Sequence, residues 1–158
     1  MKPPPTGWPR ISACVFYADP KAAIDWLCQA FGFEVRLKVE GPDGTIVHSE
    51  LTFDSGLIMV GGTGRRDPGR EAYQPFLHSP HDLNGAVTQA LCLFVDDVDA
   101  HCHRARTIGA AIFREPRTDD YGEEYWADRT YGAKDLEGHL WWFMQRVRDA
   151  KPHSPGRE

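Results

Sequence analysis

The chain carries nearly the same pattern twice. The stretch Val15-Phe16-Tyr17-Ala18-Asp19-Pro20, followed by a helical run, returns as Leu93-Phe94-Val95-Asp96-Asp97-Val98, followed by another. Later in each half a turn precedes an apolar strand, at Asp54-Ser55-Gly56 and at Leu136-Glu137-Gly138. A self-similar pair of this kind predicts two equivalent half-structures that share one core, with a ligand cavity between their sheets.

Length and charge exclude several classes of protein. The 158 residues fit one domain, and the net charge of −5 comes without a basic stripe, so we expect no nucleic-acid partner. No apolar run approaches the roughly 20 residues that span a bilayer, so we expect no membrane partner. The first residues, Met1-Lys2-Pro3-Pro4-Pro5, lack the apolar centre of a signal peptide, and the expected location is cytoplasmic.

The first half reads as βαβββ. Asp19 and Pro20 are typical of the N-cap and first position of a helix, and apolar residues recur along it at helical spacing, ending at Phe31 before Gly32. Gly41-Pro42-Asp43-Gly44 indicates a hairpin. The predicted strands cover about Ile11–Tyr17, Glu34–Glu40, Thr45–Phe53 and Leu57–Gly61.

The second half repeats this order after a long connection rich in Gly, Pro and Arg. The predicted elements are a strand at Ala90–Val95, a helix at Val98–Ile108, a short strand at Ala111–Arg114, and strands at Tyr125–Lys134 and His139–Arg146. The polar stretch Glu115–Glu124 is predicted to be a loop over the cavity mouth. We therefore expect a single domain at residues 10–147, made of module one (10–61), a connection (62–88) and module two (89–147), with tails at 1–9 and 148–158.

The doubled unit resembles the vicinal-oxygen-chelate superfamily, which includes glyoxalases, bleomycin-resistance proteins and dioxygenases. The likeness rests on Phe16–Pro20, Ala30–Phe33, Val95–Ala100 and, most specifically, Asp128–Trp142. It implies an α+β fold in which two βαβββ modules form curved mixed sheets around a cavity. It also implies a homodimer, because cavities in this fold are commonly built across two chains.

The resemblance further implies where metal-dependent members draw their ligands, namely from the first and last strand of each module. The matching positions here are Ser12, Ala90, Trp142 and either Met59 or Val60. None of these side chains suits a divalent ion of the kind held by His, Glu or Gln. We therefore expect neither a metal nor another cofactor.

Strand alternation gives an independent view of the cavity. One face of the third strand carries His48 and Glu50, and a four-residue turn at Asp135–Gly138 would place Arg129 and Tyr131 on one face with Trp142. The predicted lining is Ser12, Cys14, Phe16, His48, Glu50, Arg129, Tyr131 and Trp142. All of these except Cys14 are candidate ligand-binding residues.

His48 and Glu50 are the candidate catalytic pair. Neighbouring positions on one face of a strand lie roughly 6–7 Å apart along the backbone, so the two side chains can meet or grip one ligand. A carboxylate in an apolar cavity would have a raised pKa and act as a general base. The same pair is equally consistent with a purely structural role, and Arg129 with either an anion clamp or an internal ion pair.

Three functions remain open from the residues alone, one of them an interaction module that binds no small molecule. The first is metal-independent binding of a small planar or amphipathic molecule, sequestering an antibiotic or toxic metabolite as the resistance members of the fold do. The alternative is a lyase, isomerase or dioxygenase that uses His48 and Glu50 as an acid–base pair or as ligands of a displaced divalent metal.

Overall fold

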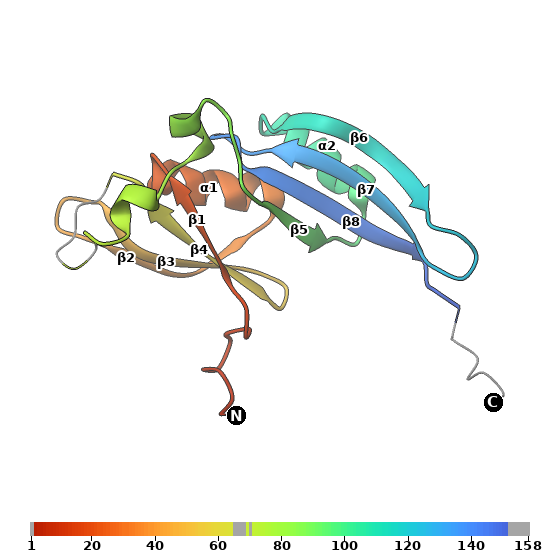
Figure 1. Ribbon diagram of the computed structural model, residues 1–158, viewed down its shortest axis with the longest axis horizontal. Helices are drawn as coiled ribbons and strands as arrows, with labels where there is room; N and C mark the ends of the chain where they lie inside the picture. Colours follow the sequence, from red (N-terminus) through yellow and green to blue (C-terminus); the bar gives the residue numbers. More distant parts are fainter. Residues whose placement is uncertain (1, 65–68, 70, 152–158) are drawn as a thin grey trace.

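The computed structural model describes residues 2–64, 69 and 71–151. The remaining residues of the predicted connection and of the two predicted tails lie outside the described part. Two modules of the same order follow each other along the chain (Figure 1). Module one contains β1 (Ala13–Tyr17), α1 (Pro20–Phe31), β2 (Glu34–Glu40), β3 (Ile46–Phe53) and β4 (Gly56–Gly62). Module two contains β5 (Ala90–Phe94), α2 (Val98–Thr107), β6 (Ala111–Asp120), β7 (Ala127–Lys134) and β8 (Leu140–Arg148).

Each module forms one four-stranded mixed sheet. Sheet A has the order β1-β4-β3-β2 and sheet B the order β5-β8-β7-β6. The first and last strands of a module pair in parallel, β1 with β4 and β5 with β8, and the other neighbours are antiparallel. The predicted α+β fold with two βαβββ modules is confirmed.

Helix α1 illustrates how local signals produce the elements. The Asp19 side chain accepts a hydrogen bond from the Ala22 N–H at 3.0 Å, and Pro20 occupies the first turn. Gly32 ends the helix in the left-handed conformation, with φ +82°. The face that packs on sheet A is formed by Ala23, Ile24, Leu27, Ala30 and Phe31, all of them buried.

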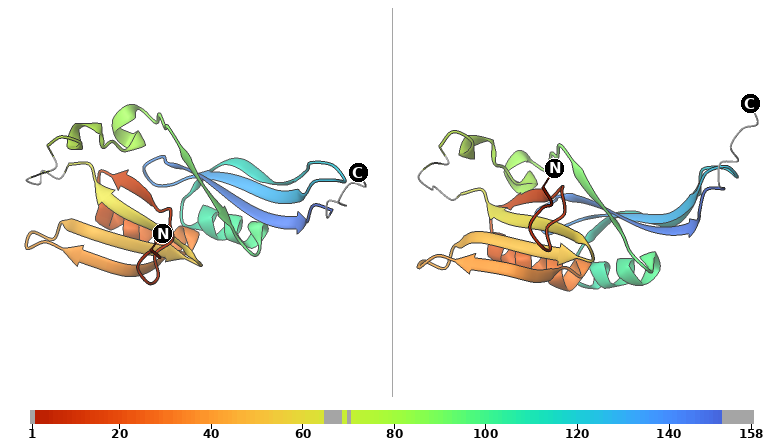
Figure 2. Two further views of the ribbon diagram at one scale, coloured as in Figure 1. Left: turned by 60° about the horizontal axis from the view of Figure 1, so that its bottom comes forward. Right: turned by 90° about the horizontal axis from the view of Figure 1, so that it is seen from below.

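The two modules meet through their helices. Helices α1 and α2 lie side by side, each covering one face of its own sheet, and within the described residues no strand of one sheet neighbours a strand of the other (Figure 2). Phe31, at the end of α1, contacts Trp141 and Phe143 of β8, with ring centroids 5.3 and 4.8 Å apart. One hydrophobic core therefore serves both modules, and the face of each sheet away from the helices, here called its open face, does not contribute to it.

The loop between β7 and β8 fastens module two to module one. Asp135 in this loop accepts hydrogen bonds from the Tyr17 hydroxyl at 2.7 Å and from the Trp141 indole at 2.9 Å. The Glu137 carboxylate accepts hydrogen bonds from the backbone N–H groups of Ala18 and Asp19, just before α1. We call Asp135–His139 the latch loop.

Module two differs from the prediction at β6. Residues 115–120 were expected to open a loop, but they continue the strand, which runs to Asp120. Irregular pairing on either side of Arg114 leaves Phe113, Glu115 and Pro116 out of register with β7, and these irregularities hide the strand pattern. Within the described residues, no helix is long and apolar enough to cross a membrane.

Candidate functional site

The open face of sheet A carries the predicted pair. His48 Nε2 lies 2.9 Å from Glu50 Oε1, and Arg36 of β2 donates to the other oxygen of the same carboxylate. Since an ionised carboxylate only accepts hydrogen bonds, His48 Nε2 carries the proton in this pair. The Glu50 side chain is 6% exposed, whereas those of His48 and Arg36 are 39% and 36% exposed. The structure thus brings His48 and Glu50 together and adds Arg36.

The pKa of Glu50 is shifted in the direction opposite to the prediction. Hydrogen bonds from His48 and then from Arg36 hold the pKa of Glu50 below its ordinary value and outweigh the effect of burial. The predicted raised pKa is therefore wrong, because the hydrogen bond from His48, and after it the contact with Arg36, favours the charged carboxylate. A carboxylate already paired with two donors is a weak general base.

The other predicted residues of sheet A lie around this cluster. Cys14 of β1 is exposed and pairs with Met59 of β4, and Phe16 pairs with Gly61, where its ring lies over the glycine. Ser12 precedes β1, and its Oγ is buried with no hydrogen-bond partner among the described residues. The open face of sheet A is thus a mixed surface with one compact polar cluster.

Arg129 and Tyr131 are not on the open face, and their predicted register is wrong. Tyr131 lies opposite Phe143 and Arg129 opposite Gln145, one position away from the prediction. The turn has five residues, Asp135–His139, because the Asp135 side chain accepts three backbone N–H bonds within it. A shift of one position moves a side chain to the other face of the sheet.

Both side chains point to the helix side of sheet B. Tyr131 is fully buried and its hydroxyl lies 2.6 Å from His101 Nδ1 of α2. Arg129 makes a two-point ion pair with Asp99 of α2, at 2.6 and 2.7 Å. Both residues therefore connect sheet B to α2 and lie away from the open face.

Trp142 does lie on the open face of sheet B, where it contacts two residues of β6. The Phe113 ring packs edge-on against it at 5.1 Å between centroids, and the Arg114 guanidinium stacks over it at 5.3 Å. Arg114 is fixed by Asp119 and by the Thr130 hydroxyl, the latter at 2.9 Å. The guanidinium is therefore held over the indole ring.

A second guanidinium is stacked further along β8. Arg146 lies between two rings, 5.6 Å from the Phe94 centroid and 5.4 Å from that of Trp126. Its Nε donates to the buried carboxylate of Asp128 at 2.6 Å. Phe94, Phe113 and Trp126 all remain more than a third exposed, so this face is an accessible strip of rings and guanidiniums.

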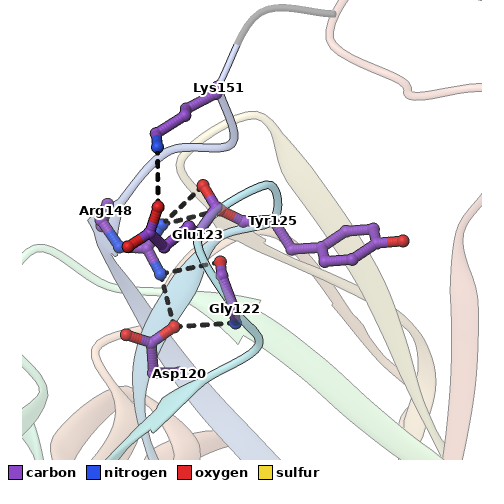
Figure 3. A network of polar contacts seen from close by, with 6 residues as sticks. All are labelled: Asp120, Gly122, Glu123, Tyr125, Arg148 and Lys151. Carbon is purple, nitrogen blue, oxygen red and sulfur yellow. Dashed lines mark hydrogen bonds and ion pairs between the residues drawn. The ribbon is translucent and has the colours of Figure 1, made fainter.

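The turn between β6 and β7 is held by one residue of β8. Arg148 donates to the carbonyl oxygens of Gly122 and Tyr125, at 3.0 and 2.9 Å, and to Asp120 (Figure 3). The Tyr125 ring points away from this network. Because Trp126 directly follows this turn, Arg148 fixes the end of the strip.

Most of the strip was missed from the sequence. Phe113 and Arg114 were assigned to a short strand and Trp126 to another, but nothing local indicated that they face the same side. The usable signal was Gly132: a Cβ there would lie 2.4 Å from the Phe113 ring, so the glycine leaves room for the ring. A glycine within a predicted strand indicates such a close approach.

The residues at the metal positions implied by the resemblance do not fit a divalent ion. Val60 is buried on the helix side, so Met59 is the open-face residue of β4, and Trp142 is covered by Arg114. Neither Ser12 nor Ala90 supplies a carboxylate or imidazole. Within the described ranges no three His, Cys, Asp or Glu side chains gather in a way that would hold a metal ion.

Known proteins of the same architecture match most of the chain. Mb0911c, an uncharacterized protein of Mycobacterium bovis, is 28% identical over 141 residues, which is 89% of this chain and 86% of that protein. The crystal structure of TioX from Micromonospora sp. ML1 has 29% identity and a TM-score of 0.64, and covers 88% of this chain and 99% of that one. A glyoxalase/bleomycin resistance protein/dioxygenase family enzyme from Burkholderia phytofirmans PsJN has a TM-score of 0.60 at 19% identity, covers 86% of this chain and 97% of that one, and supports the fold alone.

The family profile also covers most of the chain. The profile of the Glyoxalase/Bleomycin resistance protein/Dioxygenase superfamily matches residues 10–143, which include all of both modules except the end of β8. The doubled βαβββ order and the parallel pairing of first and last strands agree with this match. The chain therefore belongs to the glyoxalase/bleomycin resistance protein/dioxygenase superfamily.

Proposed function

We propose that the chain binds a small planar or amphipathic molecule on the open faces of its sheets and sequesters it, without the metal site of its metal-dependent relatives. The observation that carries the proposal is the strip on sheet B. Its exposed rings offer stacking surfaces, and its guanidiniums are fixed by carboxylates before any ligand arrives. An antibiotic or toxic metabolite with a flat ring system fits this surface.

The proposal includes a homodimer. Leu37 and Val39 of β2 pair with Glu50 and His48 and are exposed on the open face of sheet A, as Phe94 and Phe113 are on sheet B. Within the described residues no helix or strand of the chain covers either open face, and on sheet A the N-terminal segment reaches Arg36 through the Thr6 carbonyl oxygen. A second copy that places its sheet B over sheet A would bury these apolar groups and enclose the ligand between the two surfaces.

Acid–base catalysis by His48 and Glu50 is the less favoured alternative. The hydrogen bond from His48 and then the ion pair with Arg36 lower the pKa of Glu50, which suits a positioning role better than proton transfer. A displaced metal would need a third ligand beside this pair, and the described residues bring none to it. We therefore assign the cluster to polar contacts with the bound molecule.

Metal content and ligand-induced thermal shifts test the proposal together. Protein purified without a polyhistidine tag should carry no stoichiometric metal, and Ni²⁺, Zn²⁺, Mn²⁺ and Fe²⁺ should leave its melting temperature unchanged. A panel of planar antibiotics should contain compounds that raise the melting temperature saturably, since binding stabilises the native state. Sedimentation should give a dimer.

A stoichiometric metal that is lost in His48→Ala or Glu50→Ala would overturn the proposal in favour of a metalloenzyme. A panel without any saturable binder would also overturn it. Arg106→Gln is a suitable control variant, because Arg106 lies on α2 and pairs with exposed Glu115, away from both open faces. It should behave like the parent protein in every assay.

A further inference from the structure

The strip on sheet B carries three guanidiniums, each paired with a carboxylate, on an acidic protein. Arg114, Arg117 and Arg146 lie on this face and pair with Asp119, Asp128 and, just beyond the end of β8, Asp149. The strip is therefore balanced in charge, whereas the whole chain has a net charge of −5.

Arg146 has the geometry of an anion-binding group. Its Nε is bound to Asp128 and its Nη1 lies 3.4 Å from the exposed Asp149, while its Nη2 has no acceptor among the described residues. The guanidinium carbon lies 5.6 Å from the Phe94 ring centroid and 5.4 Å from that of Trp126, so two ring contacts and the bond to Asp128 restrict the movement of the remaining N–H donors. A fixed guanidinium with unused donors recognises carboxylate-like groups through charge-assisted hydrogen bonds.

Flat apolar surface lies beside these donors. Trp142 is two positions before Met144, and Met144 pairs with Phe94, so the two rings lie on neighbouring strands of the same face. Phe113 extends this surface from β6. Arg146 lies over the Phe94 ring and Arg114 over the Trp142 ring, so an aromatic ligand would pack against the exposed remainder of these two rings, with a substituent on its edge near the guanidinium of Arg146.

We propose that the open face of sheet B selects aromatic molecules that carry an anionic group, such as aromatic carboxylates, with Arg146 binding the anion and Trp142 and Phe94 binding the ring. The inference rests on the proposed function and narrows its ligand class. It assigns Arg146, a residue outside the expected site, as the specificity-determining group.

Three probes with one ring system and different charge test this inference: 2-naphthoate, 2-naphthamide and 2-naphthylmethylammonium. Calorimetric titration of the full chain should give the tightest binding for naphthoate, about tenfold tighter than naphthamide, which corresponds to about 1.4 kcal/mol. Arg146→Gln should reduce naphthoate affinity about tenfold and leave naphthamide affinity unchanged. Arg106→Gln removes the same charge elsewhere and should change neither.

The outcomes separate the inference from the proposed function. If naphthamide or the ammonium probe binds as tightly as naphthoate, the selection for anions is wrong while ring binding stands. If none of the three binds and the planar antibiotics also fail, both proposals are wrong. The comparison among probes uses the parent protein, so it remains decisive even if Arg146→Gln exposes Asp128 and fails to fold.

Discussion

On the open face of sheet A the charged groups Arg36, His48 and Glu50 satisfy one another in a compact cluster, whereas on sheet B the guanidiniums of Arg114 and Arg146 are spread over aromatic rings. Both sheets have the same strand order and pairing. The difference lies in the side chains and in the longer, irregular β6. It teaches that a duplicated module can keep its strand order while its two copies carry different surfaces, a compensated charge cluster in one and guanidiniums over aromatic rings in the other.

The largest expected effect contrasts two neighbouring tryptophans of β8. Trp141 is fully buried and its indole donates to Asp135, so Trp141→Ala should lower the free energy of unfolding by about 3–5 kcal/mol. Trp142→Ala removes a half-buried ring from the open face and should cost only about 1 kcal/mol while abolishing binding of planar ligands. Urea denaturation and calorimetry measure the two effects. Equal destabilisation by both variants would contradict the separation of core and open face.

A second pair of variants compares the two open faces directly. Gly132→Ala would place a Cβ 2.4 Å from the Phe113 ring, which must then leave its position beside Trp142. We expect a loss of naphthoate affinity of about tenfold, or about 1.4 kcal/mol. Gly61→Ala is the counterpart on sheet A, with a milder 3.0 Å approach to the Phe16 ring, and should change affinity less. Gly64, whose Cβ would meet nothing within 4 Å, supplies a control.

A smaller effect tests the corrected register of β7. Tyr131→Phe removes the hydroxyl that lies 2.6 Å from His101 Nδ1 and should lower the free energy of unfolding by about 1 kcal/mol. Because Tyr131 lies on the helix side, ligand affinity should not change. The measurements are urea denaturation and probe titration, and a selective loss of affinity would return Tyr131 to the ligand site.

The smallest effect concerns the charge cluster of sheet A. The pKa of Glu50 is lowered in the folded state below the ordinary value of 4.5, first by His48 and then also by Arg36. Its stabilising contribution is thus present above that ordinary value and is lost as the pH falls through the lowered pKa. Arg36→Gln should raise the pKa and shift this loss to higher pH.

Carboxyl NMR titration of Glu50 in the parent protein and in Arg36→Gln measures this shift directly. Lys38→Gln is a matched control, since Lys38 lies on the same strand but pairs with Glu40. If the pKa of Glu50 is the same with and without Arg36, the pairing with Arg36 no longer argues against Glu50 as a general base.

Sequence patterns predicted the elements whose signals are local. The cap at Asp19, the proline after it and the hairpin turn at Gly41–Gly44 lie within a few residues of the structures that they specify. The common face of His48 and Glu50 followed from simple alternation along one regular strand. Such features need no knowledge of what packs against them.

The features that the sequence did not reveal all depend on contacts between residues far apart in the chain. The register of β7 depends on a turn whose length is set by the Asp135 side chain, which also binds Tyr17 of module one. The extent of β6 was hidden by its bulges and by an exposed, polar edge position. The stacking of Arg146 on Phe94 and Trp126 joins three separate strands or turns, and no periodicity along one segment reveals it.

The latch loop also bears on how the chain could be divided. Its carboxylates belong to module two, but Tyr17 and the start of α1, which they bind, belong to module one. Each half expressed alone would therefore lose partners for buried polar groups as well as half of the shared core. Cleavage in the segment Ala86–Thr88 should yield two fragments that fold only when they are mixed. The amount of folded protein recovered from the mixture would then measure how strongly the latch loop holds the two modules together.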